Sequence, residues 1–275
     1  MKELTYIVLF VLFSFNSYAQ QESANWYFGV RAGLHFDGNG APAPIQGNLS
    51  TVEGSASISD NNGNILFYTD GTTVYDRNDN VMMNGTDLKG NVSSTQSAII
   101  VPRPGNPEKY YIFTVDKPDY TDKKDDPIEG INYSEVDMSL NGGNGAVIPG
   151  RKNIHLITYN PNDPVENEFK SSEKISAVIS GDCVSYWVLT QFTDKFYAFN
   201  VNATGVNNSP VISPLIRNFR PIIDDNDVNI TAKGYLKFSP DGKKIAAAYS
   251  GTSLGSPRTG TKNTGQVYLY DFDDI

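Results

Sequence analysis

Apolar residues along this chain occur in short runs of four to seven residues, and these runs are broken by Asn-Gly, Asp-Gly or Pro. Runs of this length, bounded by such residues, are typical of β-strands joined by tight turns. No stretch has apolar residues at helical spacing over a useful length. The pattern therefore predicts an all-β protein.

One strand pattern occurs four times. A strand of small and apolar residues is followed by an aromatic-rich strand, and then by a strand that ends near an acidic or amide residue. The four copies occupy residues 55–76, 97–136, 176–199 and 235–270. Their first residues are 42, 79 and 59 positions apart. The shortest interval fits one four-stranded propeller blade of about 40 to 50 residues.

The repetition favours a β-propeller, because a small twisted sheet cannot bury both faces alone, whereas blades around an axis cover one another. We predict a propeller region over residues 20–275, with about four blades present. The longer intervals then hold surface insertions at residues 117–129, 160–172 and 222–229. A pair of β-sandwich domains is the alternative.

Four blades are about the minimum for a closed propeller, so we expect the region to be incomplete at Ile275 or to close on its fourth repeat. The strand around Trp26 stands before the first repeat. In closed propellers an N-terminal strand often completes the last blade, and here that arrangement would need blades beyond Ile275 or closure with the fourth repeat.

The N-terminus has the pattern of a secretory signal peptide. Lys2 precedes an apolar run over residues 6–15, and the polar stretch that follows ends in Ser17-Tyr18-Ala19. Ten apolar residues span about 15 Å as a helix, roughly half of a bilayer core, so a membrane anchor is not favoured. We expect residues 1–19 to be a signal peptide, with a mature, secreted chain that begins at Gln20 and has no membrane span.

Composition and charge narrow the range of partners. The net charge of −9 argues against nucleic acid and anionic membranes, because both select clustered Lys and Arg. Cys183 is the single cysteine, so an internal disulfide is excluded, and we expect it to be a small buried residue within a strand. An unknown protein or glycan remains as the partner.

The candidate chemistry is sparse, and no residue is assigned a catalytic, cofactor-binding or metal-binding role. His35 and His155 lie in strand-like apolar stretches, where packed, hydrogen-bonded histidines are expected rather than metal ligands. Residues 60–64 and 76–80 space oxygen side chains two apart, as calcium loops do, but both lack the Gly and Glu of an EF-hand. A hairpin turn is the favoured interpretation for the first of these loops.

Two groups of side chains support an alternative function. Asp70, Asp116 and Asp182 fall near strand ends, where carboxylates of a carbohydrate-active enzyme (a glycosidase or lyase) would meet in a propeller channel. Tyr120 and Tyr159 lie in predicted loops and offer rings for stacking on sugars, although packing in a β-sheet wall is the simpler role for a tyrosine.

Several motifs resemble those of known secreted proteins. The segment from Phe238 to Ala246, with its Ser-Pro-Asp-Gly turn, is similar to the WD-like propeller repeats of bacterial envelope proteins. A wider set of motifs resembles the N-terminal propeller region of large Bacteroidetes cell-surface proteins. These motifs are Asn25-Trp26-Tyr27-Phe28-Gly29, Ala32-Gly33-Leu34-His35-Phe36, residues 53–60, residues 66–71 and residues 94–102.

Proteins of that family typically end in a gliding-motility-associated C-terminal domain that type IX secretion uses as a sorting signal. The resemblance implies export to the outer cell surface and a non-enzymatic role in binding, adhesion or scaffolding. It supplies no catalytic residues. The carbohydrate-active enzyme remains the alternative.

Overall fold

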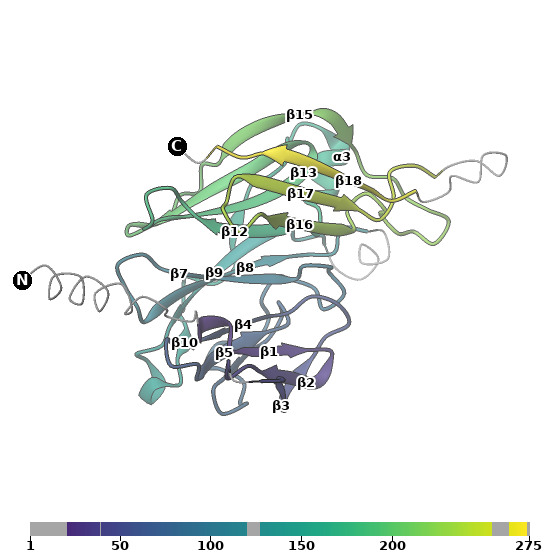
Figure 1. Ribbon diagram of the computed structural model, residues 1–275. Coiled ribbons are helices and arrows are strands. Elements are labelled where there is room, and N and C mark those ends of the chain that lie inside the picture. The colour runs from purple at the N-terminus through teal and green to yellow at the C-terminus, as the bar shows by residue number, and fades with distance from the viewer. Residues whose placement is uncertain (1–20, 39, 120–126, 255–263, 274–275) are drawn as a thin grey trace, which may run out of the picture.

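The computed structural model describes residues 21–38, 40–119, 127–254 and 264–273. These residues form five small antiparallel sheets that follow one another in chain order (Figure 1). The all-β prediction is confirmed. The expected signal peptide at residues 1–19 and the candidate Tyr120 lie outside the described residues.

The first two sheets are three-stranded meanders. The first sheet, which follows the 3-10 helix η1 (Gln21–Ser23), contains β1 (Asn25–Phe28), β2 (Val30–His35) and β3 (Ala43–Ser50). The second sheet contains β4 (Ala56–Ser59), β5 (Ile65–Thr69) and β6 (Val74–Asp76). The strand around Trp26 does not pair with the fourth repeat within the described residues. It pairs with β2 and opens the first sheet, which lies outside the four repeats, because the chain reverses at Gly29, where φ is 57°.

The remaining three sheets correspond to the second, third and fourth sequence repeats. The third sheet contains β7 (Ala98–Pro102), β8 (Lys109–Val115), β9 (Ile131–Asp137), β10 (Ala146–Val147) and β11 (Ile154–Leu156), with the 3-10 helix η2 (Asn141–Gly143) before β10. The fourth contains β12 (Ile175–Ile179), β13 (Tyr186–Asn202), β14 (Gly205–Val206) and β15 (Val211–Phe219), and α3 (Pro164–Phe169) precedes it. The fifth contains β16 (Gly234–Phe238), β17 (Lys244–Tyr249) and β18 (Gln266–Asp271).

The long strand β13 folds back on itself. A straight strand of 17 residues would span about 55 Å, yet the side chain of Asn200 donates to Ser185 Oγ at 3.5 Å. Thr193, midway between them, has a φ of 48°, which marks the reversal. Its first half pairs with β12 and its second half with β15. The strand β13 thus supplies two neighbouring strands of the fourth sheet, at residues 186–190 and 196–199, which are the positions predicted from the third sequence repeat.

Each pair of neighbouring sheets shares one apolar core cluster. Aromatic residues dominate the contacts, as in the stacked rings of Tyr27 and Tyr68, whose centroids are 4.0 Å apart. The main members are Tyr27, Leu49 and Tyr68 between the first and second sheets; Leu66, Phe67, Ile112 and Val136 between the second and third; Phe113, Val115, Val188 and Phe199 between the third and fourth; and Leu189, Phe196, Leu236 and Ala247 between the fourth and fifth.

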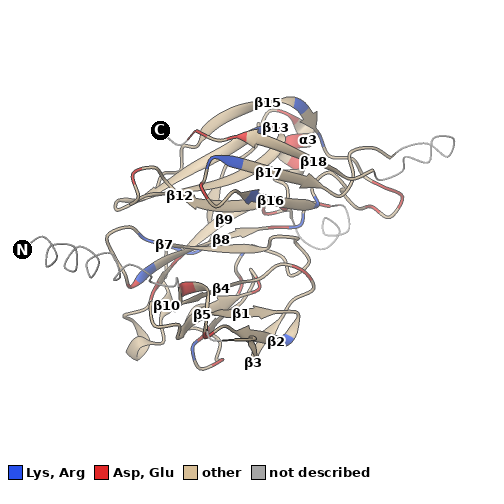
Figure 2. Cartoon of the chain, in the orientation of Figure 1, with Lys and Arg blue, Asp and Glu red and all other residues tan. Residues whose placement is uncertain are grey.

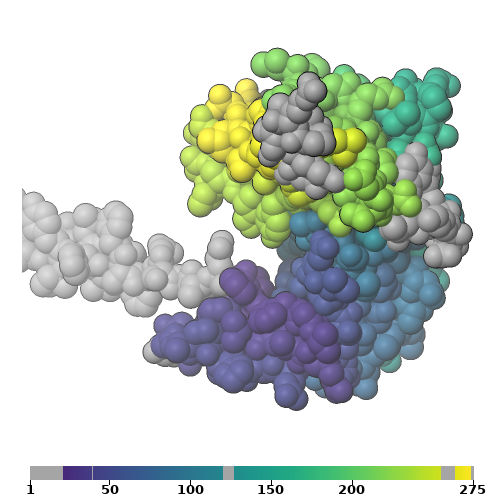
Figure 3. Space-filling model, turned by 90° about the vertical axis from the view of Figure 1, so that its right-hand side faces the viewer, coloured from purple at the N-terminus to yellow at the C-terminus, as the bar shows by residue number. Residues whose placement is uncertain are grey.

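The two terminal sheets each leave one apolar face uncovered. On the first sheet Trp26 and Phe28 are 51% and 39% exposed, and on the fifth sheet Val267 and Leu269 are 66% and 76% exposed. Figure 3 shows the purple first sheet and the yellow last strand on the same side of the molecule. Figure 2 shows most of the strand ribbon in tan, with Lys, Arg, Asp and Glu mainly in turns and at strand ends.

The first strand of each sheet lies next to the first strand of the following one, in the order β1, β4, β7, β12 and β16. These strands need hydrogen-bond partners at their free edges. Gln96 supplies them for two strands at once. Its Oε1 accepts from the backbone N–H of Ile175 at 3.3 Å and of Leu236 at 2.8 Å, and its Nε2 donates to the Leu236 carbonyl at 3.2 Å.

A lysine is fully buried between the fourth and fifth sheets. Lys174 Nζ donates to the carbonyls of Thr231 and Ala232, both at 2.8 Å, and lies 4.5 Å from the centre of the Tyr249 ring. Burial lowers the pKa of Lys174 to about 7, and the charge of neighbouring Glu173 opposes that shift. The folded protein thus disfavours the charged lysine relative to the unfolded chain.

The prediction that Cys183 is buried in a strand was wrong. The thiol is exposed, and the residue lies in the turn between β12 and β13 with a φ of 57°. Its backbone N–H donates to the Ser180 carbonyl, which closes the turn at that residue. None of the described helices is long and apolar enough to cross a membrane.

Replacing Gln96 by Ala is expected to lower the free energy of unfolding by about 2 to 4 kcal/mol, because it leaves two N–H groups and one carbonyl of the inner strands without their partner. Urea-induced unfolding measures this loss. The variant Gln96→Glu keeps the hydrogen-bond acceptor and loses the donor. Its free energy of unfolding should lie between those of wild type and Gln96→Ala. Equal stability of Gln96→Ala and wild type would contradict the role given to this side chain.

The buried lysine predicts a pH dependence. Because the pKa of Lys174 is about 7 when folded and near 10.4 when unfolded, the unfolded state binds more protons between these values, and stability rises with pH across this window. Lys174→Met should lose this rise, which is on the order of 2 to 4 kcal/mol from pH 7 to pH 10. Urea unfolding of both proteins at several pH values tests this, and parallel curves would disprove it.

Candidate functional site

An open cleft lies where the third and fourth sheets meet, and we refer to it as the junction cleft. Its volume is about 580 Å³, within the range of about 300 to 1,000 Å³ found for small-molecule sites. One wall comes from β11 and the residues after it, and the other from β15 and the loop before it. The lining residues are His155, Ile157, Tyr159, Asn160, Lys195, Tyr197, Asn208, Ser209, Pro210 and Ile212.

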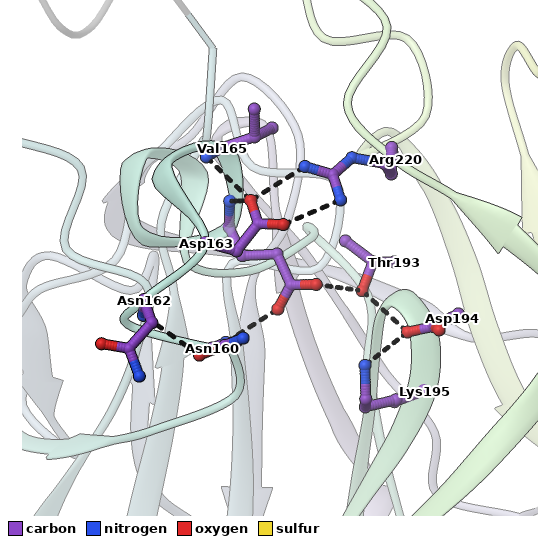
Figure 4. A network of polar contacts seen from close by, with 9 residues as sticks. Asn160, Asn162, Asp163, Val165, Thr193, Asp194, Lys195 and Arg220 are labelled. Carbon is purple, nitrogen blue, oxygen red and sulfur yellow. Dashed lines mark hydrogen bonds and ion pairs between the residues drawn. The ribbon is translucent and has the colours of Figure 1, made fainter.

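The wall after β11 is held by a short helix and an ion pair (Figure 4). Asp163 caps α3 by accepting from the N–H groups of Val165 and Glu166 at 3.0 and 3.1 Å, and Pro164 begins the helix. The same carboxylate binds both terminal nitrogens of Arg220, which follows β15, at 2.8 and 2.9 Å. The Arg220 guanidinium lowers the pKa of Asp163 to about 2. This pair joins the insertion before the fourth sheet to the end of that sheet.

Glu166 connects α3 to the cleft itself. Its buried carboxylate accepts from the backbone N–H of Asn160 at 2.7 Å and from the Thr193 hydroxyl at 3.3 Å (Figure 4). Asp194, also within reach of that hydroxyl, pairs with Lys195 Nζ at 2.5 Å. This ion pair lowers the pKa of Asp194. Both carboxylates near the cleft are therefore engaged in positioning its wall and its lysine.

The aromatic lining of the cleft is neutral. Burial raises the pKa of Tyr197, with the charges of Glu166 and Asp194 adding to the effect, so the phenol keeps its proton. Partial desolvation by the surrounding chain and the charge of Lys170 lower the pKa of His155, which favours the neutral imidazole. The Tyr159 hydroxyl lies 3.5 Å from His155 Nε2, at the limit of a hydrogen bond.

Each of the three candidate channel carboxylates accepts hydrogen bonds from backbone N–H groups of its own loop. Asp70 accepts from the N–H groups of Thr72 and Thr73 at 2.8 and 2.7 Å. Asp116 accepts from the N–H of Lys117 at 2.7 Å and of Glu129 at 2.6 Å. Asp182 accepts from the N–H groups of residues 184 and 185, both at 2.8 Å. None of the three lines the junction cleft.

The two loops with calcium-like spacing are hairpin turns. Asp60 Oδ1 accepts from the N–H groups of Asn62 and Asn64, both at 2.9 Å, and Gly63 has a φ of 81°. The turn at Asp76 repeats this geometry, with a φ of 62° at Asp79. A type I turn followed by a residue with positive φ is a common three-residue hairpin loop. Within the described ranges no group of three or more metal-ligating side chains occurs.

The histidine predictions had different outcomes. His35 Nδ1 lies 2.9 Å from Asn25 Oδ1 in the first sheet, as expected of a packed, hydrogen-bonded histidine. His155 is exposed and faces the cleft, so it is not a packed residue. The sequence also named Tyr159, which packs partly on the core and lines the cleft. The sequence did not identify Lys195, Tyr197 and Asn208 as residues of a site. The one feature of the sequence that hinted at the cleft was the long interval between the second and third repeats, where α3 and one wall of the cleft lie.

No family model matches this chain, and no significant match was found among curated proteins or solved structures. The site is therefore interpreted from its geometry.

Replacing Asp163 by Asn keeps the helix cap but removes the ion pair with Arg220. We expect amide hydrogen exchange over residues 160–169 to rise about 3- to 10-fold at neutral pH, because the wall after β11 loses its link to β15. Exchange mass spectrometry measures this. Because the folded pKa of Asp163 lies below the unfolded value, its contribution is present above about pH 4 and is lost as the pH falls toward 2.

Asp241→Asn is the matched control for this variant. Asp241 is also an exposed turn-capping carboxylate, accepting from Ser239 Oγ and the Lys243 N–H, and it lies in the fifth sheet. It should leave exchange over residues 160–169 unchanged. The role assigned to the ion pair would be refuted by equal exchange in Asp163→Asn and wild type.

Proposed function

We propose that this chain is a secreted, non-enzymatic β-propeller module that binds a protein or a glycan at the outer cell surface. The observation that carries the binding role is the junction cleft. Its wall is fixed by the Asp163–Arg220 pair and by Glu166, and its lining offers aromatic rings, hydroxyls and amides. A few convergent polar groups in a largely preformed hollow are typical of binding sites.

The propeller architecture is supported by how the sheets follow one another. Five sheets are stacked through four apolar clusters, in chain order, with their first strands adjacent. In a pair of sandwiches each sheet would need one buried face and one polar face. The second, third and fourth sheets instead bury both faces against neighbours, as blades do.

The uncovered faces of the first and fifth sheets fit an incomplete propeller. The face with Trp26 and Phe28 looks away from the second sheet, and the face with Val267 and Leu269 looks away from the fourth. Further blades of the same kind would cover both faces and close the ring. Such a module is a scaffold, and its clefts and loops are then the surfaces available for partners.

Non-enzymatic function is supported by the positions of the carboxylates. A glycosidase needs two carboxyl groups facing one substrate. Asp70, Asp116 and Asp182 each cap a separate turn, and Glu166 and Asp194 at the cleft are bonded to neighbouring groups. These structural roles account for the presence of the carboxylates without a catalytic function. The expected signal peptide and the resemblance to envelope proteins support export to the surface.

The proposed function is tested with the purified chain on immobilised extracellular matrix proteins and insoluble polysaccharides such as cellulose, chitin and mannan. We expect retention of folded protein on at least one of them, without release of soluble sugar or peptide. Heat-denatured chain is the control for nonspecific adsorption. Steady release of reducing sugars or of new amino termini would replace the binding role with an enzymatic one, and absence of retention on every surface would refute adhesion.

A further inference from the structure

The junction cleft is lined by a tyrosine whose hydroxyl has no hydrogen-bond partner among the described residues. Tyr197 is 4% exposed and lines the floor of the cleft, and its hydroxyl makes no hydrogen bond within the described part of the chain. Two other buried tyrosines have a partner in the protein: Tyr68 donates to Asp79 Oδ1 at 2.7 Å, and Tyr110 donates to the Pro107 carbonyl at 3.1 Å. The Tyr249 hydroxyl, in contrast, is closed off from solvent and has no partner among the described residues. Unlike the Tyr249 hydroxyl, the Tyr197 hydroxyl is not closed off from its cleft, so it is available to hydrogen-bond to a group that enters.

The polar groups around Tyr197 are held in place by the protein. Asn160 has its backbone N–H on Glu166 and its Oδ1 on the N–H of Asn162 at 3.0 Å. Asn208, on the opposite wall, hydrogen-bonds to the Tyr133 hydroxyl. The Asn160 amide nitrogen has no partner among the described residues, and it lines the cleft together with the Ser209 hydroxyl. The cleft therefore presents several oriented donors and acceptors within one small volume.

The charge of the cleft is balanced. Lys195 is the one charged residue in its lining, and Asp194 compensates it at 2.5 Å. The neutral form of His155 is favoured, because partial desolvation and the charge of Lys170 lower its pKa. An anionic or cationic ligand would have to compete with the Lys195–Asp194 pair. A neutral ligand would meet hydroxyls, amides and an imidazole with no such competition.

The edges of the cleft are apolar. Ile157 and Ile212 stand on opposite walls and are 56% and 53% exposed, and Pro210 lies beside Ile212. The His155 and Tyr159 rings, whose centroids are 6.0 Å apart, provide flat surfaces between them. Sugars combine alternating hydroxyls with C–H faces, which match this combination of hydrogen-bonding groups and apolar surfaces.

We propose that the junction cleft binds a neutral oligosaccharide, and that the Tyr197 hydroxyl hydrogen-bonds to it. This rests on the binding role proposed above and names the ligand class and a recognition residue. The volume of about 580 Å³ gives room for a short oligosaccharide.

The test uses the full chain and four neutral probes, namely cellohexaose, laminarihexaose, mannohexaose and chitohexaose, in titration calorimetry. We expect at least one probe to bind with a Kd of about 1 mM or tighter. Tyr197→Phe should weaken that binding about 3- to 10-fold, the value of one hydrogen bond, and leave the melting temperature unchanged because the hydroxyl bonds nothing in the protein. The Kd should change less than about two-fold between about 0.05 and 0.5 M NaCl, since the ligand carries no charge.

Tyr235→Phe is the matched control, because it removes a hydroxyl from a 51% exposed tyrosine on the outer face of the fifth sheet. It should bind the probe as wild type does. The proposal is overturned if no neutral hexasaccharide binds at about 10 mM, if Tyr197→Phe binds like wild type, or if only polygalacturonate binds and does so in a salt-dependent manner. Retention on a surface that Tyr197→Phe leaves intact would refute this site but keep the binding function, whereas cleavage of a probe would refute the function itself.

Discussion

The structure depends on one constraint: a sheet of three or four short strands has two faces and cannot cover either of them itself. In this chain the solution is face-to-face stacking, with one apolar cluster between each pair of neighbouring sheets. Burial of aromatic surface is the main favourable term at these interfaces, as in the stacked Phe219 and Tyr249 rings, 4.0 Å apart. The outer apolar faces of the first and fifth sheets stay exposed, because no described part of the chain covers them.

Stacking also means that backbone N–H and C=O groups need hydrogen-bond partners where the first strands of the sheets converge. Backbone groups at these edges lie too deep for water to reach freely, so side chains have to pair with them. Gln96 does this for β12 and β16, and the buried ammonium of Lys174 does it for the carbonyls of residues 231 and 232. The lysine has a lowered pKa because it gives up hydration to do so. Apolar packing thus holds the sheets together, and a few buried polar side chains fix how their inner edges meet.

The junction cleft arises where the repeat is least regular. The interval between the second and third repeats holds β11, α3 and the turn at Asn160, which together add a wall that a regular unit would lack. The Asp163–Arg220 pair and Glu166 hold this wall against the fourth sheet without extending the apolar core. The opening that remains exposes the Tyr197 hydroxyl from within the core cluster. The insertion therefore supplies one wall of the cleft, and the fourth sheet supplies Tyr197 and the opposite wall.

The sequence determined the β-class, the four repeated sheets and their turns, because strand alternation and turn residues such as Pro240-Asp241-Gly242 act over a few positions. It also named His155 and Tyr159, although not as neighbours. The additional first sheet at the N-terminus, the exposure of Cys183 in a turn and the pairing of Asp163 with Arg220 were decided only by the tertiary structure. Each depends on which distant segments meet, and a pattern of local hydrophobicity does not encode that. Tyr197 makes the same point: its sequence context specifies a buried strand residue, while the absence of a partner for its hydroxyl follows only from how two sheets and an insertion come together.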